Sequence, residues 1–181
     1  LIPAYNEERS IAEVICHMRS IELSHLGISE KEIILINDGS RDKTVEKAMS
    51  RSPAIQVINH IKNQGKGASI ISGIKYATGD IIIIQDADLE YSPCFYPQLL
   101  KPIIEENLDI VYGSRFLKQG HPDKMRMSYF LANRFGTSLV NILCGSRLTD
   151  VMTCLKVFRI DALKKLNLLS KDFGIDAELT I

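Results

Sequence analysis

Short runs of β-branched and aliphatic residues alternate along this chain with segments whose apolar positions recur every three or four residues. The runs predict strands at residues 1–3, 32–36, 55–58, 81–84, 109–112 and 156–159. The segments between them have the spacing of amphipathic helices, as at Ile11, Val14, Ile15 and Met18. This alternation predicts an α/β fold, with a Rossmann-like, mostly parallel sheet flanked by helices and joined by right-handed crossovers.

Polar residues predict where two of these helices begin. We expect Asn6 to cap the first helix, with Glu7 and Glu8 favourably placed in its first turn. Asp42 is expected to cap the second helix in the same way. Nearer the end of the chain, a longer amphipathic helix carries a set of large apolar residues: Phe130, Leu131, Phe135, Leu139, Ile142 and Leu143.

The segment 81–90 combines a buried strand with an acidic end. Its four isoleucines have no polar face, which is typical of a strand covered on both sides, as in a parallel sheet. Asp86 and Asp88 follow, and two residues spaced by one point to the same side of an extended chain. Two carboxylates with few nearby cations favour a hard divalent metal completed by water and phosphate oxygens, while the alternative is an ordinary acidic turn.

Three turns that follow predicted strands are expected to meet in one cleft, because parallel strands place their carboxyl ends along one edge. Asp38 follows the second strand, residues 65–67 follow the third, and Asp86 follows the fourth. We expect Asp38 to accept hydrogen bonds from a base or a ribose, and Lys66 to meet a phosphate. The two glycines beside Lys66 would let the backbone approach a ligand. A turn-forming aspartate and a loop with a solvated lysine are the alternatives.

Composition and missing motifs exclude several classes of protein. With 181 residues and 45% hydrophobic side chains the chain can form one domain, and a formal net charge of zero argues against a broad nucleic-acid surface. No apolar run reaches the roughly 20 residues of a membrane span. Neither a GxxxxGK[ST] nor a GxGxxG pattern follows a strand. The four cysteines and four histidines show no metal-binding spacing and are typical of a cytosolic protein.

The two ends of the chain predict that it is a fragment of a longer protein. The sequence begins inside a predicted strand and stops inside a possible helix. We interpret residues 1–181 as a single catalytic domain truncated at both ends.

Five motifs carry a resemblance to a known family. They are Pro-Ala-Tyr-Asn-Glu at 3–7, Asn-Asp-Gly-Ser-x-Asp at 37–42, Asn-x-Gly-Lys-Gly at 63–67, Asp-Ala-Asp-Leu-Glu at 86–90 and Gly-Ser-Arg at 113–115. In this order and spacing, over residues 2–178, the chain resembles family 2 glycosyltransferases, and most of all polyprenyl-phosphate (dolichyl-phosphate) mannosyl- and glucosyltransferases. The resemblance implies a GT-A fold, a nucleotide-sugar donor, and Mg²⁺ or Mn²⁺ as cofactor.

The resemblance also implies roles for individual residues. Residues that would line the donor's nucleoside pocket are Pro3, Tyr5, Glu7, Ile36 and Asp38. Residues that would hold the metal and the diphosphate are Asp86, Ala87 and Asp88, with Glu90 as a possible third metal ligand where the family often has Gln. Residues that would face phosphate or sugar are Arg115, Arg126, Lys156 and Lys66. Two departures are Asn37, where the family commonly has Asp, and the segment 150–156, which matches the family pattern loosely.

The resemblance implies transfer of a hexose, with inversion, from UDP-glucose or GDP-mannose to a lipid phosphate at the cytoplasmic face of a membrane. Asp88, Arg115 and Asp150 are the expected catalytic residues. A lipid phosphate is already anionic and needs no strong base, but basic residues should line its entry; the candidates are Arg126, Arg134, Lys156 and Arg159. The segment 119–127 is either an acceptor lid or a surface loop.

Other functions stay open. A saccharide or other hydroxyl acceptor would require a carboxylate base, for which Asp150 and Asp176 are the candidates. A sugar-nucleotide pyrophosphorylase lacks support because its glycine-rich signature is absent. A non-catalytic nucleotide-binding module would bind its ligand without metal.

Overall fold

The computed structural model describes residues 1–117 and 125–181. The strands of this part of the chain are β1 (Ile2–Ala4), β2 (Ile34–Asn37), β3 (Gln56–Asn59), β4 (Ile81–Ile84), β5 (Ile110–Tyr112) and β6 (Lys156–Arg159). Each strand expected from the sequence is present, within two residues of its expected bounds.

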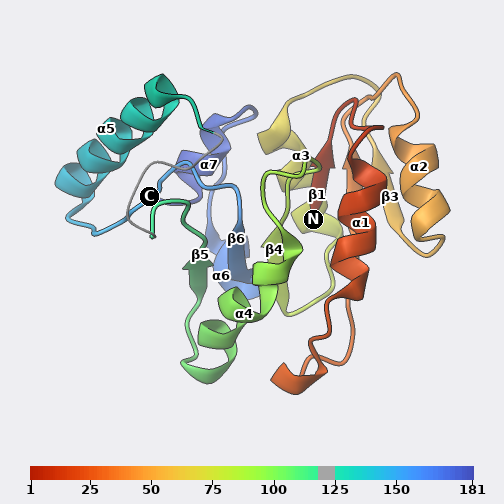
Figure 1. The fold of residues 1–181 in the computed structure, drawn as a ribbon, viewed down its shortest axis with the longest axis horizontal. Helices are drawn as coiled ribbons and strands as arrows, with labels where there is room; N and C mark the ends of the chain where they lie inside the picture. Colours follow the sequence, from red (N-terminus) through yellow and green to blue (C-terminus); the bar gives the residue numbers. More distant parts are fainter. Residues whose placement is uncertain (118–124) are drawn as a thin grey trace.

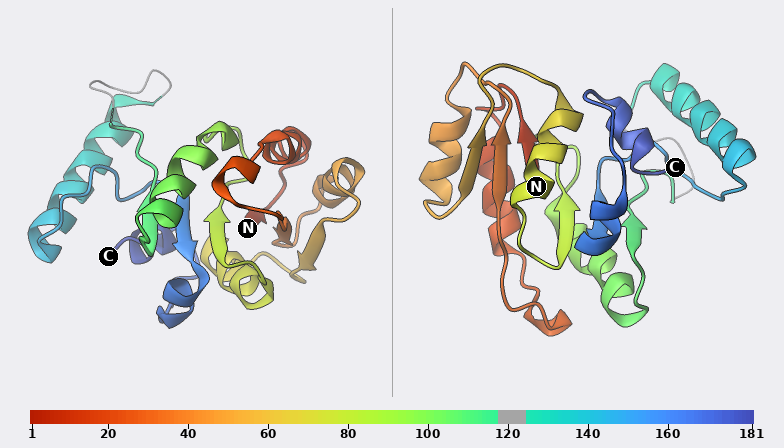
Figure 2. Two further views of the ribbon diagram at one scale, coloured as in Figure 1. Left: turned by 90° about the horizontal axis from the view of Figure 1, so that it is seen from below. Right: turned by 180° about the vertical axis from the view of Figure 1, so that it is seen from behind.

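Helices occupy the segments between the strands (Figure 1). They are α1 (Ile11–Ser20), α2 (Thr44–Arg51), α3 (Lys66–Tyr76), α4 (Tyr96–Glu105), α5 (Met127–Cys144), α6 (Ile160–Lys165) and α7 (Gly174–Glu178), with short 3-10 turns η1 (Ser24–Leu26) and η2 (Pro93–Phe95). Seen from below, α1 and α4 cover one side of the strands, while α3 and α6 cover the other (Figure 2). None of these helices is long and apolar enough to cross a membrane.

The strands form two groups that meet at the amino end of the chain. β1, β2 and β3 are parallel neighbours in that order. In the second group β6 lies between β4 and β5 and runs antiparallel to both. Leu1 joins the groups, because its amine donates to the Ile83 carbonyl at 2.7 Å and its carbonyl accepts from the Gln85 N–H at 3.0 Å. The mostly parallel α/β fold is confirmed, and the reversed β6 is an addition that simple alternation did not predict.

Two apolar cores lie on opposite faces of the strands, as the alternation of side chains along β2 illustrates. Leu35 belongs to the core shared with α1 and α4, whereas its neighbours Ile34 and Ile36 belong to the core shared with α3, α6 and α7. Because successive strand residues point to opposite faces, a run of apolar residues can serve both cores. The apolar strand runs in the sequence are therefore explained by burial on two sides.

The prediction that Asn6 caps α1 is wrong. Ser10 stands at the N-cap position, and Asn6 lies before the helix with a positive φ of 57°. Its Oδ1 instead accepts the Arg41 N–H at 2.9 Å, which ties the two turns together. Asp42 is one residue from its predicted position, since Lys43 occupies the N-cap of α2, but its Oδ1 still accepts the Thr44 N–H at 3.0 Å.

α5 presents its polar side to the protein and its apolar side to solvent. The buried residues of this helix are Asn133 and Thr137. The exposed ones include Leu131, Phe135 and Ile142, the last two at 74% and 76% exposure. Figure 1 shows α5 at the periphery of the molecule, away from both cores. The segment expected to be an acceptor lid, 119–127, lies for the most part outside the described residues.

Candidate functional site

Three turns at the carboxyl ends of β2, β3 and β4 meet, as the sequence predicted. The carboxylate of Asp38 accepts the N–H groups of Gln64, at 2.9 Å, and Gly65, at 2.8 Å. The next residue, Lys66, places its Nζ 2.8 Å from Oδ1 of Asp86. One continuous set of contacts therefore links Asp38 to the acidic end of β4.

Asp38 holds the shape of the turn rather than standing free in it. It is buried, and besides the two backbone groups it contacts Nδ1 of His60 at 2.7 Å. His60 in turn reaches Oγ of Ser72 on α3 through Nε2 at 2.9 Å. His60 was not identified from the sequence. The signal that could have identified it is its position directly after β3, since polar residues also follow β2 and β4.

The two glycines of this turn allow a close approach, but to another part of the chain. A Cβ on Gly65 would clash with the Lys171 carbonyl, and a Cβ on Gly67 with that of Ser170. The Ala68 N–H donates to the Lys171 carbonyl at 3.0 Å, so residues 170–172 pack directly on the start of α3. These glycines are expected to make room for a ligand, but the space beside them is occupied by the backbone of residues 170–171.

Lys66 lies between two carboxylates from separate elements. Its Nζ is 2.8 Å from Oδ1 of Asp86 and 3.1 Å from Oδ2 of Asp176 on α7. Burial alone would lower the pKa of Lys66, but the two carboxylates outweigh it and raise the pKa above its ordinary value. The sequence suggested few cations near Asp86, and this lysine corrects that view.

Asp88 lies in a cluster of negative charge. Burial raises its pKa first, and the carboxylates of Asp86, Glu90 and Glu7 raise it further, although the Glu90 N–H donates to its Oδ1 at 3.0 Å and opposes the shift. No basic side chain bonds to Asp88 in the described part of the chain. A hard cation is the partner that such a carboxylate lacks, so the oxygen donors of Asp86 and Asp88 fit Mg²⁺ or Mn²⁺.

The donor set offered by the protein is small. Within residues 1–117 and 125–181, no three His, Cys, Asp or Glu side chains gather as a metal-binding group. Glu90, the possible third ligand, directs Oε1 to Nη1 of Arg115 at 3.0 Å. A metal at Asp86 and Asp88 would therefore depend on water and substrate phosphates for its other ligands.

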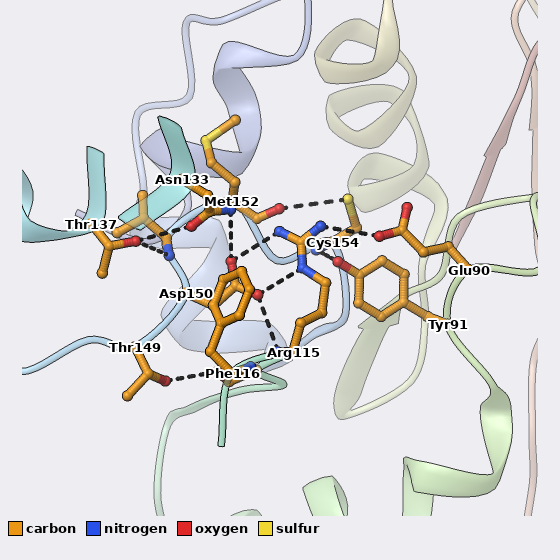
Figure 3. Close-up of polar contacts among 12 residues, drawn as sticks. Glu90, Tyr91, Arg115, Phe116, Asn133, Thr137, Thr149, Asp150, Met152 and Cys154 are labelled. Atoms are coloured by element: carbon orange, nitrogen blue, oxygen red, sulfur yellow. Dashed lines mark hydrogen bonds and ion pairs between the residues drawn. The ribbon is translucent and has the colours of Figure 1, made fainter. Parts of the chain in front are cut away.

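Arg115 forms the second half of the site, together with Asp150 (Figure 3). Its Nε and Nη2 bind the two carboxylate oxygens of Asp150 at 2.8 and 2.9 Å. Asp150 also accepts the Arg115 N–H and Nδ2 of Asn133, each at 3.1 Å. Asp150 is only 3% exposed. Since each of its oxygens already accepts two hydrogen bonds, Asp150 orients Arg115 and has no free lone pair aimed at a substrate.

Aromatic rings flank the Arg115 guanidinium. Its central carbon lies 5.8 Å from the centre of the Tyr91 ring and 5.6 Å from that of Phe116. Burial lowers the pKa of Arg115, but the hydrogen bonds that it donates to Asp150 and Glu90, together with the negative charge of Asp150, outweigh burial and raise the pKa above its ordinary value. Among the described residues, Nη1 contacts the half-exposed carboxylate of Glu90, so this edge of the guanidinium is the part that a ligand can reach.

The remaining predicted site residues are distributed between the surface and the cores. Pro3, Ile36 and Ala87 are buried, Glu7 is half-buried, and Tyr5 is exposed; Arg126 is exposed at the start of α5. The negative charge of Glu7 raises the pKa of Asp88. The roles predicted for these residues stay predictions.

Lys156 and Arg159 do not lie where an acceptor could enter. Lys156 is 0% exposed, and its Nζ donates to Oγ1 of Thr180 at 2.7 Å. Burial lowers its pKa to about 8. Arg159 donates to the carbonyl of Ile103, at 2.7 Å, beneath α4. Both belong to β6, which lies between β4 and β5 and buries Lys156, so the prediction that Lys156 binds substrate is corrected. Arg159 is half-buried and pairs with Ile81 at the start of β4, the end of that strand away from Asp86.

Comparison with known proteins gives one family and several relatives. The model of "Glycosyl transferase family 2" matches residues 1–167. The chain is 30% identical to uncharacterized protein MJ1222 of Methanocaldococcus jannaschii over its whole length and 73% of that protein. It is 35% identical to a dolichol-phosphate mannosyltransferase of Pyrococcus furiosus, over 66% of this chain and 33% of that one. It is 26% identical to an undecaprenyl-phosphate mannosyltransferase of Micrococcus luteus, over 99% of this chain and 74% of that protein.

Solved structures share the fold. Glucosyl-3-phosphoglycerate synthase from Mycobacterium tuberculosis, in complex with Mn²⁺, UDP and glucosyl-3-phosphoglycerate, superposes with a TM-score of 0.74 at 21% identity. The alignment covers 97% of this chain but only 61% of that one. The predicted GT-A fold is confirmed by this likeness and by the family match.

Proposed function

Because the chain belongs to glycosyl transferase family 2 and is therefore a glycosyltransferase, we propose that it moves a hexose from UDP-glucose or GDP-mannose to a polyprenyl phosphate. Two relatives are named for this kind of acceptor, dolichol phosphate in one and undecaprenyl phosphate in the other. The observation that carries the proposal is the state of the two candidate general bases.

Neither candidate base is available for a hydroxyl acceptor. Asp150 uses both oxygens on Arg115 and Asn133. Asp176 is buried and pairs with Lys66. An acceptor hydroxyl needs a base within hydrogen-bond reach, whereas a phosphate monoester arrives already ionised. The arrangement therefore favours a phosphate acceptor over a saccharide hydroxyl.

The donor's diphosphate would meet charge on two sides. Mg²⁺ or Mn²⁺ held by Asp86 and Asp88 would supply a Lewis acid for the departing nucleoside diphosphate. On the protein's side, Asp150 and the flanking rings keep Arg115 in one orientation, and its Nη1 edge can donate to a phosphate oxygen in exchange for Glu90. A fixed guanidinium costs little reorganisation when charge develops on the leaving group.

The outer face of α5 supports a lipid acceptor. Exposed apolar residues line it: Met127, Tyr129, Leu131, Phe135, Leu139, Ile142 and Leu143. Between residues 125 and 149 there are three arginines, at 126, 134 and 147, and no acidic residue. An apolar helix face flanked by basic residues has the pattern of a helix that lies in a membrane interface. We propose that this face rests on the membrane that contains the acceptor.

The test is transfer of labelled sugar by the full-length protein. UDP- and GDP-sugars carrying a radiolabel are incubated with polyprenyl phosphate, with Mn²⁺ or with EDTA. We expect label in the organic phase only with metal and with one of the two nucleotides. Asp88→Asn should abolish transfer, while Asp161→Asn, on the exposed side of α6, should leave it unchanged. Label confined to water-soluble glycans would overturn the proposed acceptor.

A further inference from the structure

Lys66 is one cation shared by two carboxylates from different parts of the chain, the half-buried Asp86 and the buried Asp176. Asp86 follows β4 and is a proposed metal ligand, whereas Asp176 lies on α7, 90 residues further on. The side chains of Lys66 and Asp176 are 9% and 4% exposed, and that of Asp86 is 17% exposed. The most open member of the trio is thus the one that would bind the metal.

Asp176 has acceptor capacity that nothing in the described structure uses. Its Oδ2 accepts from Nζ of Lys66 at 3.1 Å and lies 3.7 Å from Sγ of Cys154. Its Oδ1 is buried and has no hydrogen-bond partner among the described residues. A buried carboxylate oxygen without a partner is costly, so a second donor arriving there would be favoured.

The position of Asp176 is fixed by the glycine turn that also carries Lys66. Residues 170–172 pack on Gly65 and Gly67, and Glu178 accepts the N–H groups of Leu169 and Ser170 at 2.8 Å each. α7 is thereby held against the start of α3. The distance between Asp176 and Lys66 is therefore set by backbone packing and not by a flexible side chain.

We infer that Lys66 is the exchangeable counter-ion of Asp86, and that Asp176 is the carboxylate that receives it when a divalent cation binds. Without metal, Lys66 neutralises part of the charge at the end of β4. A metal at Asp86 competes with the lysine for Oδ1, and Asp176 offers the displaced ammonium a partner that is already in contact. Lys66 and Asp176 are positioning residues that set metal affinity. This inference rests on the proposed metal site at Asp86 and Asp88.

Two substitutions should shift affinity in opposite directions. Lys66→Met removes the competitor, so the full-length protein should bind Mn²⁺ at least fivefold more tightly. Asp176→Asn leaves the lysine with Asp86 as its one carboxylate, so Mn²⁺ binding should weaken about tenfold. Free Mn²⁺ measured by electron paramagnetic resonance, without nucleotide, gives both constants. Lys62→Met, an exposed lysine of the preceding turn, is the matched control and should change nothing.

A double-mutant cycle separates this inference from a simple loss of negative charge. If Asp176 acts through Lys66, Asp176→Asn should change Mn²⁺ affinity less than twofold in a Lys66→Met background. An equal effect in both backgrounds would mean that Asp176 acts on the metal through space, and the inference would be wrong. Unchanged or weaker binding by Lys66→Met would overturn it too. If instead the wild-type protein binds no Mn²⁺, or binds it equally well as Asp88→Asn, the proposed metal site itself fails.

Discussion

At the scale of single residues, the site consists of charged groups that are already paired. Arg115 is held by Asp150, Asp86 by Lys66, and Asp38 by the turn that it supports. Asp88 differs because it has no cationic partner among the described residues and stands among other carboxylates. The distribution of partners therefore separates a group that awaits a cation from groups that orient their neighbours.

Asp150 should behave as a positioning residue. In Asp150→Asn one charge-assisted bond to Arg115 is lost, and we expect kcat to fall about 10- to 100-fold because the guanidinium is no longer held. The acidic limb of the pH profile of kcat should stay where it is in the wild type. If Asp150 were a general base, Asp150→Asn would lose the acidic limb of this pH profile. Asp161→Asn serves as the control.

Lys156 should make stability depend on pH. Its pKa is about 8 in the folded protein, below the ordinary 10.5, because burial disfavours the charged form. Between these values the unfolded chain binds more protons, so the free energy of unfolding rises with pH. Relative to Lys156→Met, the wild type should gain about 2 kcal/mol between pH 7.5 and pH 10. Urea unfolding of both proteins measures this difference, and a constant difference would contradict it.

At the scale of elements, glycines explain how two distant segments come into contact. The turn before α3 accepts residues 170–172 because Gly65 and Gly67 carry no side chain. α5 shows a second principle at this scale, since its packing is polar. Oδ1 of Asn133 accepts from Thr137, and Thr137 accepts the Val151 N–H at 3.2 Å, so the helix is attached through hydrogen bonds rather than through its apolar face.

A matched pair of glycine substitutions tests the first contact. Gly67→Ala should lower the free energy of unfolding by about 1–3 kcal/mol, because the new methyl group meets the Ser170 backbone. Gly136→Ala, within α5, has open space around the new methyl group and should stabilise by about 0.5–1 kcal/mol through helix propensity. Thermal or urea unfolding gives both values. Two changes of the same sign would count against the packing described.

At the scale of the whole molecule, the candidate site joins both halves of the fold. Asp38 and Lys66 come from the parallel strands and the start of α3, whereas Arg115 and Asp150 flank β5 and β6. α5 is connected to the Arg115 half of the site because Nδ2 of Asn133 donates to Oδ1 of Asp150 (Figure 3). A surface contacted by α5 would therefore be coupled to Asp150 and to the orientation of Arg115.

The orientation of the molecule at a membrane can be tested on this face. Substitution of Phe135 and Ile142 by Ser removes exposed apolar groups without touching the buried Asn133 and Thr137. We expect the double variant of the full-length protein to bind vesicles with anionic lipids at least fivefold more weakly in a flotation assay. Ile61→Ser, at an exposed apolar residue outside α5, is the control. Equal binding by all three proteins would argue against α5 as the contact.

Local pattern was enough to predict the strands, the α/β class and the convergence of three turns. The spacing of apolar residues along the chain reflects which side chains are buried. A strand that is covered on both faces needs apolar residues at every position, as at 81–84. The acidic pair at 86 and 88, the Gly-Lys-Gly turn and the Gly-Ser-Arg segment were likewise visible, because each lies beside a strand end in the sequence itself.

Long-range partners were decided by the tertiary structure alone. β6 enters between β4 and β5, which buries Lys156, and α7 brings Asp176 to Lys66 across 110 residues. Asp150 becomes the partner of Arg115, and the apolar side of α5 turns outward because Asn133 and Thr137 satisfy buried polar groups. A side chain's charge and spacing are local properties, but its partner depends on which distant segment the fold places beside it. The sequence was therefore sufficient to predict that the three turns converge, and only the fold could show which of their charges are already paired.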